Sequence, residues 1–317
     1  MKDRTKKDLI FLLISVVLYA VFEGLMLTDV IPPYMERSIV SICINVILAA
    51  SLNLINGITG QFSIGHAGFM AVGAYIGAIM TVKFGLPFIV AILAGACSAA
   101  LLGVLIGLPT LRLSGDYLAI ATLGLGEIIR IVILNIPYVG GAAGFMGIPK
   151  DTTFTWAFFV MIFTLLFIRN FVDSSHGRAC IAIRENEIAA EAMGVNTTRY
   201  KVLAFAIGAA FAGVAGALFA HYNYMAHPGS FNFLKSFDIL TMVVFGGLGS
   251  MTGAVTGAVV LTLLTFLLAD IPELRMVIYS LLLIILMLYR PQGLFGSREF
   301  SLKVFTRLLG GRRRDNA

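Results

Sequence analysis

The longest polar interval in the chain runs from Ser174 to Lys201 and reads SSHGRACIAIRENEIAAEAMGVNTTRYK. Apolar runs of membrane-spanning length flank it on both sides. Within the interval, the side chain of Asn186 can accept a hydrogen bond from the free N–H groups of a first helical turn. Gly194 is a natural helix stop, because only glycine enters the left-handed conformation at little cost. The pattern therefore predicts a helix of about two turns between these two residues.

This short helix is expected to be amphipathic. At helical spacing, one face carries Ile188, Ala189, Ala192 and Met193, and another carries Glu187 and Glu191. Two interpretations fit such a helix in a loop. It either lies on the lipid headgroups, or it is a plug that fits a groove in a separate protein.

The composition indicates a polytopic membrane protein with an all-α fold. Of the 317 residues, 59% are hydrophobic and only 13% are charged, whereas a soluble domain carries about a quarter charged residues. Most of the surface must therefore face lipid. The net charge of +6 does not indicate nucleic-acid binding, because the basic residues cluster at the ends and in loops. No soluble domain interrupts the chain, so residues 1–317 are expected to form a single transmembrane domain.

The apolar segments predict between eight and ten membrane crossings. They are Leu9–Leu27, Ser38–Ile55, Phe69–Val82, Pro87–Leu108, Tyr117–Leu134, Thr155–Ile168, Val202–Tyr222, Phe237–Leu248, Gly253–Leu268 and Arg275–Leu288. If 237–268 forms a re-entrant pair, the count is eight. Both counts are even, so both termini are expected on one side. Segments assigned to that side hold 17 of the 23 basic residues, which indicates the cytoplasm.

A glycine-rich break, NGITGQFSIGHAG, interrupts the apolar pattern at Asn56–Gly68. Unwound backbone at membrane depth is tolerated only where protein or a water-filled cavity surrounds it. The residues proposed for a polar passage here are Asn56, Gly57, Gly60, Gln61, Ser63, Gly65 and His66. A second break at Gly246–Gly249 resembles the first, as in transporters built on repeats, although coincidence is nearly as good an explanation in a glycine-rich chain.

Two further patterns lie inside the apolar segments. Glu127 and Arg130 are spaced to pair on one helix face, either as a structural ion pair or as part of the passage. Glycines also recur at four-residue spacing, which predicts close helix packing in lipid. They are Gly249, Gly253 and Gly257, Gly73 with Gly77, and Gly103 with Gly107.

Missing motifs exclude several activities. The chain has no G-x-x-x-x-G-K-[ST] loop, so it is not expected to hydrolyse ATP. The four histidines show no metal-ligand spacing, and no G-x-S-x-G sequence suggests a hydrolase. We therefore expect a chain that is not an enzyme and that holds no metal or cofactor of its own.

Three strings resemble the LivM-type permease subunits of branched-chain amino acid ABC importers. They are NLINGITGQFSIGHAGFMAVGAY at 53–75, LRLSGDYLAIATLGLGEIIR at 111–130 and RENEIAAEAMGVN at 184–196. In the third string, Ala189, Ala190 and Gly194 match the Glu-Ala-Ala-x-x-x-Gly pattern of importer permeases. Ile188 stands where that pattern has glutamate, and the nearest acid is Glu187. The Ile-x-Leu-Pro tail of the broader family does not follow.

The resemblance implies a fold like that of the larger, two-half importer permeases, in the cytoplasmic (inner) membrane. It also implies two separate ATP-binding subunits that dock on residues 186–194, a second similar permease, and an extracytoplasmic binding protein. The substrates would be leucine, isoleucine and valine, moved by alternating access. A permease for urea or short amides is the alternative within the class. An ion-coupled secondary transporter, with Glu127 or Asp238 as its ion site, is the alternative outside it.

Overall fold

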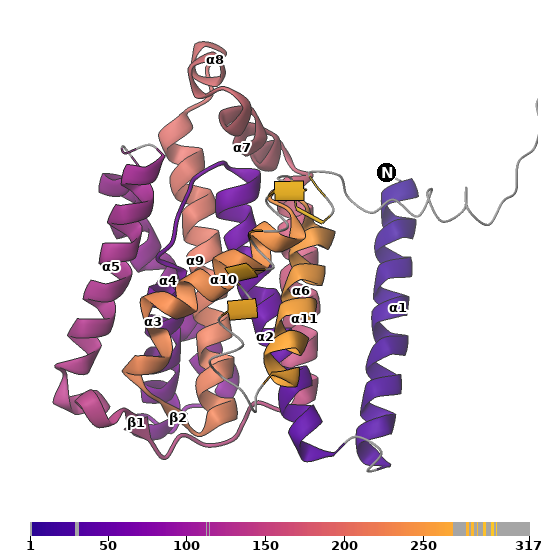
Figure 1. Cartoon of the computed structure of the whole chain (residues 1–317), viewed down its shortest axis with the longest axis vertical. Helices are drawn as coiled ribbons and strands as arrows, with labels where there is room; N and C mark the ends of the chain where they lie inside the picture. Colours follow the sequence, from indigo (N-terminus) through magenta and orange to yellow (C-terminus); the bar gives the residue numbers. More distant parts are fainter. Residues whose placement is uncertain are drawn as a thin grey trace, which may run out of the picture.

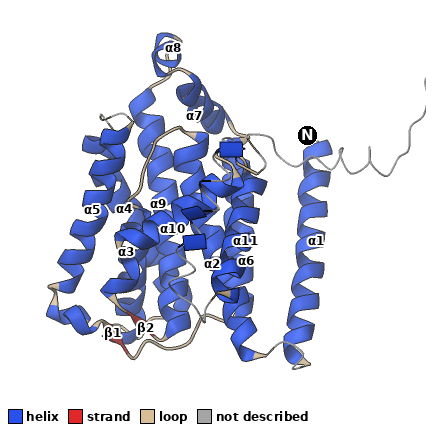
Figure 2. Cartoon of the chain, viewed as in Figure 1, coloured by secondary structure: helices blue, strands red, loops and turns tan. Residues whose placement is uncertain are grey.

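The computed structural model is an all-α bundle (Figures 1 and 2). It describes residues 2–28, 32–111, 113 and 115–268, with isolated positions between 277 and 296. The expected span Arg275–Leu288 therefore lies largely outside the described residues, as does the basic segment from Arg290 onward.

The long apolar segments form the body of the bundle. Its helices are α1 (Lys2–Leu27), α2 (Pro33–Asn53), α3 (His66–Ala78), α4 (Phe88–Thr110), α5 (Asp116–Leu134), α6 (Phe154–Val172), α9 (Thr197–Asn223), α10 (Phe233–Gly246) and α11 (Met251–Leu267). Two π-helical turns, η1 (Leu54–Ile58) and η2 (Ile79–Lys83), extend α2 and α3. The polar interval contains α7 (Ser175–Glu185) and α8 (Glu187–Ala192).

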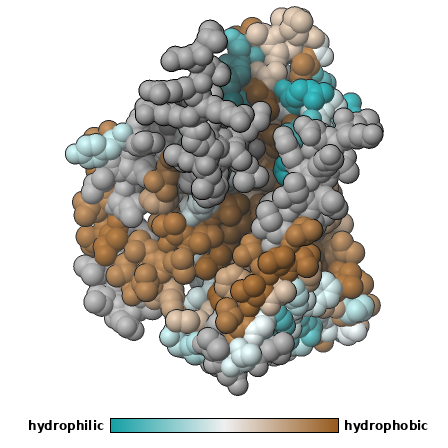
Figure 3. Space-filling view, turned by 90° about the vertical axis from the view of Figure 1, so that its right-hand side faces the viewer, coloured by the Kyte–Doolittle hydropathy of each residue, from teal (hydrophilic) through white to brown (hydrophobic). Residues whose placement is uncertain are grey.

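The helix lengths agree with a polytopic membrane protein. Among the described residues, five helices are long and apolar enough to cross a bilayer: α2 with η1, α4, α5, α6 and α9. Ser15–Met26 and Met251–Leu267 are shorter apolar helices. Helix α10 has 14 residues, about 21 Å at 1.5 Å per residue, which is short for a hydrocarbon core of about 30 Å. Figure 3 shows apolar side chains across the middle of one face, with polar ones toward its two ends.

Side-chain caps fix where the later helices begin. In each case a side-chain oxygen accepts a hydrogen bond from a backbone N–H of the first turn, as N-caps do. The capping residues are Thr153 for α6, Ser174 for α7, Asn186 for α8, Asn196 for α9, Asn232 for α10 and Ser250 for α11. These caps fix the first turn of each of the six helices.

The loop between α5 and α6 contains structure that the sequence did not predict. Two short 3₁₀ turns, η3 (Pro137–Val139) and η4 (Gly141–Ala143), precede the strand β1 (Phe145–Met146). This strand pairs antiparallel with β2 (Met225–Ala226), which follows α9. The 3₁₀ turn η5 (Pro228–Phe231) then leads to α10. The pairing ties together the two loops at the end of the bundle opposite α8 (Figure 2).

Glycines let α3, α4 and α9 approach closely at the centre of the bundle. A Cβ atom on Gly73 would collide with the backbone of Gly213 on α9. A Cβ on Gly95 of α4 would lie 2.9 Å from the Gly73 carbonyl oxygen. The predicted packing role is therefore confirmed for Gly73, because small residues allow backbones to meet where lipid offers no hydrophobic driving force.

We expect Gly73→Ala to lower the free energy of unfolding by about 1–3 kcal/mol, the usual cost of overpacking. The matched control is Gly24→Ala on α1, where an added Cβ meets nothing within 4 Å. There alanine should be neutral or stabilising by about 0.5–1 kcal/mol, because glycine is the poorer helix former. Denaturant unfolding of both variants in detergent measures this. Equal stabilities would refute the packing argument.

Candidate functional site

Helix α8 forms as the sequence predicted. The Asn186 Oδ1 atom accepts from the Ala189 N–H at 3.0 Å. At the other end, the Gly194 N–H donates to the Glu191 carbonyl at 2.9 Å, and the Val195 N–H donates to the Ala190 carbonyl at 3.0 Å. These two bonds make a Schellman motif, with Gly194 in the left-handed region at φ +85°. The predicted cap and stop are both confirmed.

The apolar side chains of α8 point away from the chain's own core. Ile188 is 82% exposed and Met193 is 84% exposed, whereas Ala190 is buried against the bundle. Figure 1 shows α8 at the extreme tip of the molecule, beyond the ends of the long helices. Glu187 forms an ion pair with Lys201 at the start of α9, which holds the first turn of α8 in place. The helix thus offers two large apolar side chains that the described part of the chain leaves exposed.

The sequence did not predict α7, the helix that supports α8. Its signal was Ser174, whose Oγ atom accepts from the Gly177 N–H at 3.3 Å. Cys180 and Ile183 bury one side of α7, and the Cys180 thiol donates to the Tyr200 carbonyl of α9 at 3.9 Å. Burial raises the pKa of the Cys180 thiol to about 11, so it remains protonated and unreactive at neutral pH.

The first break is held by polar contacts from several helices. Asn56 clamps Ser63 with two bonds, from Nδ2 to the Ser63 carbonyl at 3.1 Å and from the Ser63 N–H to Oδ1 at 3.2 Å. The Ile64 N–H donates to Thr122 of α5, and the Ala67 N–H donates to Ser236 of α10, each at 3.1 Å. The break therefore joins α2, α3, α5 and α10 at one place.

The break turns back along α2. The continuous apolar helix Tyr34–Ile58 has 25 residues, about 38 Å at 1.5 Å per residue, which exceeds a hydrocarbon core of about 30 Å. The helix ends on the side of the bundle that carries α7 and α8 (Figure 1). From there the chain reverses, because Ser63 bonds to Asn56 and His66 bonds to Ser51. The membrane depth of the polar passage stays a prediction.

Three proposed passage residues carry buried polar atoms without a hydrogen-bond partner among the described residues. They are the side-chain oxygen and nitrogen of Gln61, the Ser63 hydroxyl and the Nδ1 atom of His66. The other ring nitrogen of His66 bonds to the Ser51 hydroxyl at 2.8 Å. Each such unsatisfied group lowers the stability of the fold by about 1–3 kcal/mol. Because several of them occur in one segment, a functional role for that segment is the explanation to test.

The two breaks meet each other. A Cβ on Gly57 would collide with the backbone N of Gly249. Asn53 joins the breaks further, because its Oδ1 atom accepts from the Gly249 N–H at 2.8 Å and its Nδ2 donates to the Ser250 carbonyl at 3.1 Å. Here we call Asn53, Gly57, Gly249 and Ser250 the crossing. The sequence showed that the two breaks resemble each other, with coincidence as an alternative explanation, but it did not predict that they touch.

The Glu127–Arg130 pair forms as predicted. The Arg130 Nε atom donates to Glu127 Oε2 at 2.7 Å, and the two side chains are 23–24% exposed. Helix α5 packs beside the first break, since a Cβ on Gly126 would lie 3.4 Å from the Gly65 Cα. Only 17% of the most apolar stretch of α5 is buried inside the bundle, against 78% of the corresponding stretch of α2. The pair thus stands on the most exposed of the long apolar helices that the structure describes.

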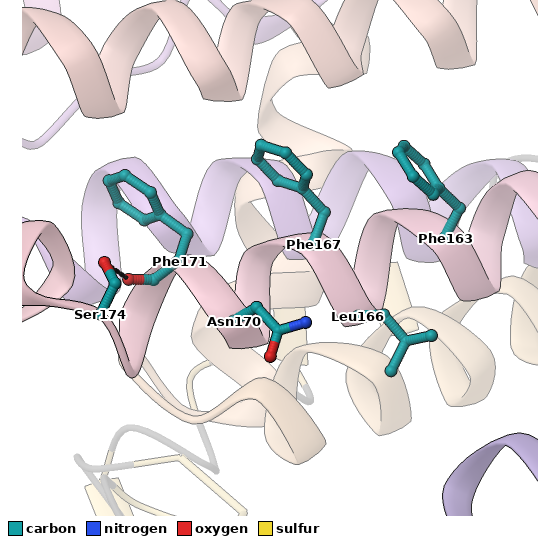
Figure 4. A pocket seen from close by; sticks show the side chains of 6 residues that line it. All are labelled: Phe163, Leu166, Phe167, Asn170, Phe171 and Ser174. Carbon is teal, nitrogen blue, oxygen red and sulfur yellow. Dashed lines mark hydrogen bonds between the residues drawn. The ribbon is translucent and has the colours of Figure 1, made fainter. Parts of the chain in front are cut away.

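A shallow groove on α6 is a weaker candidate. Figure 4 shows the rings of Phe163, Phe167 and Phe171 in a row along one side, with Leu166 and Asn170 below them. Ser174, at its end, donates to the Phe171 carbonyl at 2.6 Å. Its lining is almost entirely apolar, as expected for a lipid-facing helix, and it offers little to recognise a polar substrate.

Comparison with known proteins identifies relatives along most of the chain. The family described as "Branched-chain amino acid transport system / permease component" matches residues 34–287. The high-affinity branched-chain amino acid transport system permease protein LivM of Salmonella typhimurium is 38% identical over 297 residues, which cover 82% of this chain and 70% of the relative. LivM of Escherichia coli is 36% identical with the same coverage. LivH of Escherichia coli is 35% identical over 144 residues, or 45% of this chain and 46% of LivH. No solved structure matches.

Proposed function

Because the chain belongs to the permease-component family of branched-chain amino acid transport systems, we propose that it is the LivM-type membrane subunit of an ATP-driven importer. It carries leucine, isoleucine and valine into the cell by alternating access, across the cytoplasmic (inner) membrane. The energy comes from two separate ATP-binding subunits, so the chain itself holds no cofactor. A second, similar permease completes the pore, and an extracytoplasmic binding protein delivers the substrate.

The observation that carries this proposal is the exposed apolar tip of α8. Ile188 and Met193 are more than four-fifths exposed, on a helix whose ends are fixed by a side-chain cap and a Schellman motif. Lipid contact does not require a helix that stands beyond the bundle. A rigid apolar helix that projects from a cytoplasmic loop fits a groove on a partner protein, and an ATPase subunit is the partner that supplies energy.

The partly exposed ion pair on α5 supports a second permease. A charged side chain that faces lipid near the bilayer centre costs about 2.5–3.5 kcal/mol by insertion scales. Glu127 and Arg130 form an ion pair and are partly exposed. They lie on a helix whose most apolar stretch is only 17% buried. A second permease that packs on α5 would shield the Glu127–Arg130 ion pair from lipid. The translocation route would then run between the two permease subunits.

The route on this chain comprises the first break and the adjacent turn of α5. It uses Asn56, Gly57, Gly60, Gln61, Ser63, Gly65 and His66, together with Glu127 and Arg130. The unpartnered atoms of Gln61, Ser63 and His66 provide both donors and acceptors for a zwitterionic amino acid. Because all three side chains are buried, the route is closed at the α7–α8 end in this conformation.

Uptake into proteoliposomes tests the proposed function. The complex of this chain with its second permease and ATPase subunits is reconstituted, with ATP enclosed on the side of α8 and the binding protein on the other side. We expect leucine uptake that requires ATP and that isoleucine and valine inhibit, while urea does not. Uptake driven by a Na⁺ or H⁺ gradient without ATP would show an ion-coupled carrier instead, and inhibition by urea would favour the amide permease.

The orientation can be tested by labelling in intact cells. Cys43, Cys97 and Cys180 are first replaced by serine, and Glu187→Cys or Asp151→Cys is then introduced. A membrane-impermeant maleimide should react with position 151 and miss position 187, because the excess of basic residues places α8 in the cytoplasm. Labelling of position 187 in unbroken cells would reverse the assigned orientation.

A further inference from the structure

Arg184 connects the α7–α8 loop to the crossing. It stands in the last turn of α7, directly before the residues that lead into α8. Its Nη1 atom donates to the Gly57 carbonyl at 2.9 Å. Its Nε and Nη2 atoms donate to Oε1 of Glu185 at 3.1 and 2.6 Å. One planar guanidinium therefore spans from its own helix to the break that ends α2.

Both breaks are shaped to accept this side chain. A Cβ on Gly60 would lie 2.8 Å from Arg184 Cγ, and a Cβ on Gly249 would lie 2.9 Å from Nη1. The two glycines also adopt left-handed backbone angles, with φ of +73° and +85°. A side chain at position 60 would press on the aliphatic part of Arg184, one at position 249 would press on its guanidinium, and either would strain the backbone. Arg184 thus lies in a cradle that takes one glycine from each break.

The mechanical path from α8 to the crossing is short. Asn186 caps α8 and follows Glu185, the residue that fixes the Arg184 guanidinium. Arg184 in turn holds Gly57, and Gly57 packs on Gly249. A displacement of α8 that carries the last turn of α7 with it must therefore either move the Gly57 carbonyl as well or break the Arg184 bond.

We propose that Arg184 is a positioning residue that transmits movement of α8 to the crossing of the two broken helices. This inference rests on the proposed function, because the ATPase subunits supply the movement. When α8 shifts, Arg184 moves Gly57 relative to Gly249 and opens or closes the end of the bundle next to Gln61 and His66. The planar fork of arginine suits this role, since it binds a carboxylate and a carbonyl in one fixed geometry, which the single ammonium of lysine does not.

The test uses the complete complex in proteoliposomes, with Arg184→Gln and Arg184→Lys. The matched control is Arg178→Gln on the same helix, whose guanidinium donates to the Asp173 carbonyl at 3.1 Å instead. Two quantities are measured at equal amounts of assembled complex. One is leucine uptake per ATP hydrolysed, and the other is the effect of nucleotide on maleimide labelling of Phe62→Cys, a position 37% exposed in the first break.

We expect Arg184→Gln to keep the ATPase subunits, because α8 is intact, but to lower uptake per ATP about tenfold, within the usual range for a lost coupling contact. Labelling at position 62 should change with nucleotide in the parent complex and cease to do so in Arg184→Gln. Arg184→Lys should show the same defects, and it carries the test if Arg184→Gln does not assemble. Arg178→Gln should match the parent in both measurements.

A purely structural role for Arg184 predicts a different pattern. Less complex would then assemble, but each assembled complex would transport normally. For Arg184→Gln and Arg184→Lys, uptake per ATP within about twofold of the parent would therefore overturn the inference, since loss of a coupling contact is expected to change uptake per ATP at least about fivefold. Labelling at position 62 that still responds to nucleotide would overturn it as well. A parent complex without ATP-driven uptake would instead refute the proposed function, and this inference with it.

Discussion

Replacement of Ile188 by aspartate is expected to release the ATPase subunits from the permease. The Ile188 side chain is 82% exposed in the isolated chain and would be buried on docking. Burying a large aliphatic side chain is worth about 1.5–3 kcal/mol, so its loss should weaken docking about 10- to 150-fold. Co-purification of the ATPase subunits with the tagged permease measures the effect, together with ATPase activity stimulated by the loaded binding protein.

Two comparisons sharpen this experiment. Met146→Asp makes a comparable change at a side chain that is 64% exposed at the opposite end of the bundle, and it should retain the subunits. Gly194→Val should weaken docking although it adds no charge, because valine is strained at φ +85°. An added Cβ there meets nothing within 4 Å, so strain on α8 is the cause. If Ile188→Asp and Gly194→Val both keep the subunits, a headgroup-bound helix becomes the better account.

The second large effect is expected at the unpartnered polar atoms of the first break. Gln61→Leu and Ser63→Ala should raise the free energy of unfolding by up to about 1–3 kcal/mol each, because they remove buried groups without partners. The same variants should lower leucine uptake about tenfold or more, since a polar contact to a charged ligand is worth about 1.5–3 kcal/mol. The complex should still assemble.

A stability gain combined with lost transport distinguishes a substrate contact from ordinary packing. The matched control is Thr152→Val, because the Thr152 hydroxyl is also buried without a partner among the described residues but lies in the loop before α6. This variant should gain stability and keep full uptake. Normal uptake by Gln61→Leu and Ser63→Ala would reduce the first break to a packing element.

Local signals were sufficient to predict much of the fold and of α8. Asn186 and Gly194 act through hydrogen bonds and backbone angles within a few residues of themselves, so their effect can be read from neighbouring sequence. The ion pair of Glu127 and Arg130 is equally local, at i, i+3. The lengths of the apolar segments similarly predicted the long helices, whose observed ends differ from the predicted ones by several residues.

The features that the sequence did not reveal depend on distant contacts. Arg184 bonds to a carbonyl 127 positions earlier in the chain, and Asn53 bonds to Gly249 at a separation of 196. No local pattern reports which backbone group a guanidinium will reach. The π-helical turn at Leu54–Ile58 also extends the helix past the predicted end at Ile55.

The central claim is that separate ATPase subunits act on this permease through α8. A photoreactive benzoylphenylalanine at position 188 tests it most directly, with position 146 as the control. Illumination of the intact complex should give a covalent adduct with an ATPase subunit from position 188 and none from position 146. Adducts from position 188 with lipid alone, or equal adducts from both positions, would contradict the claim.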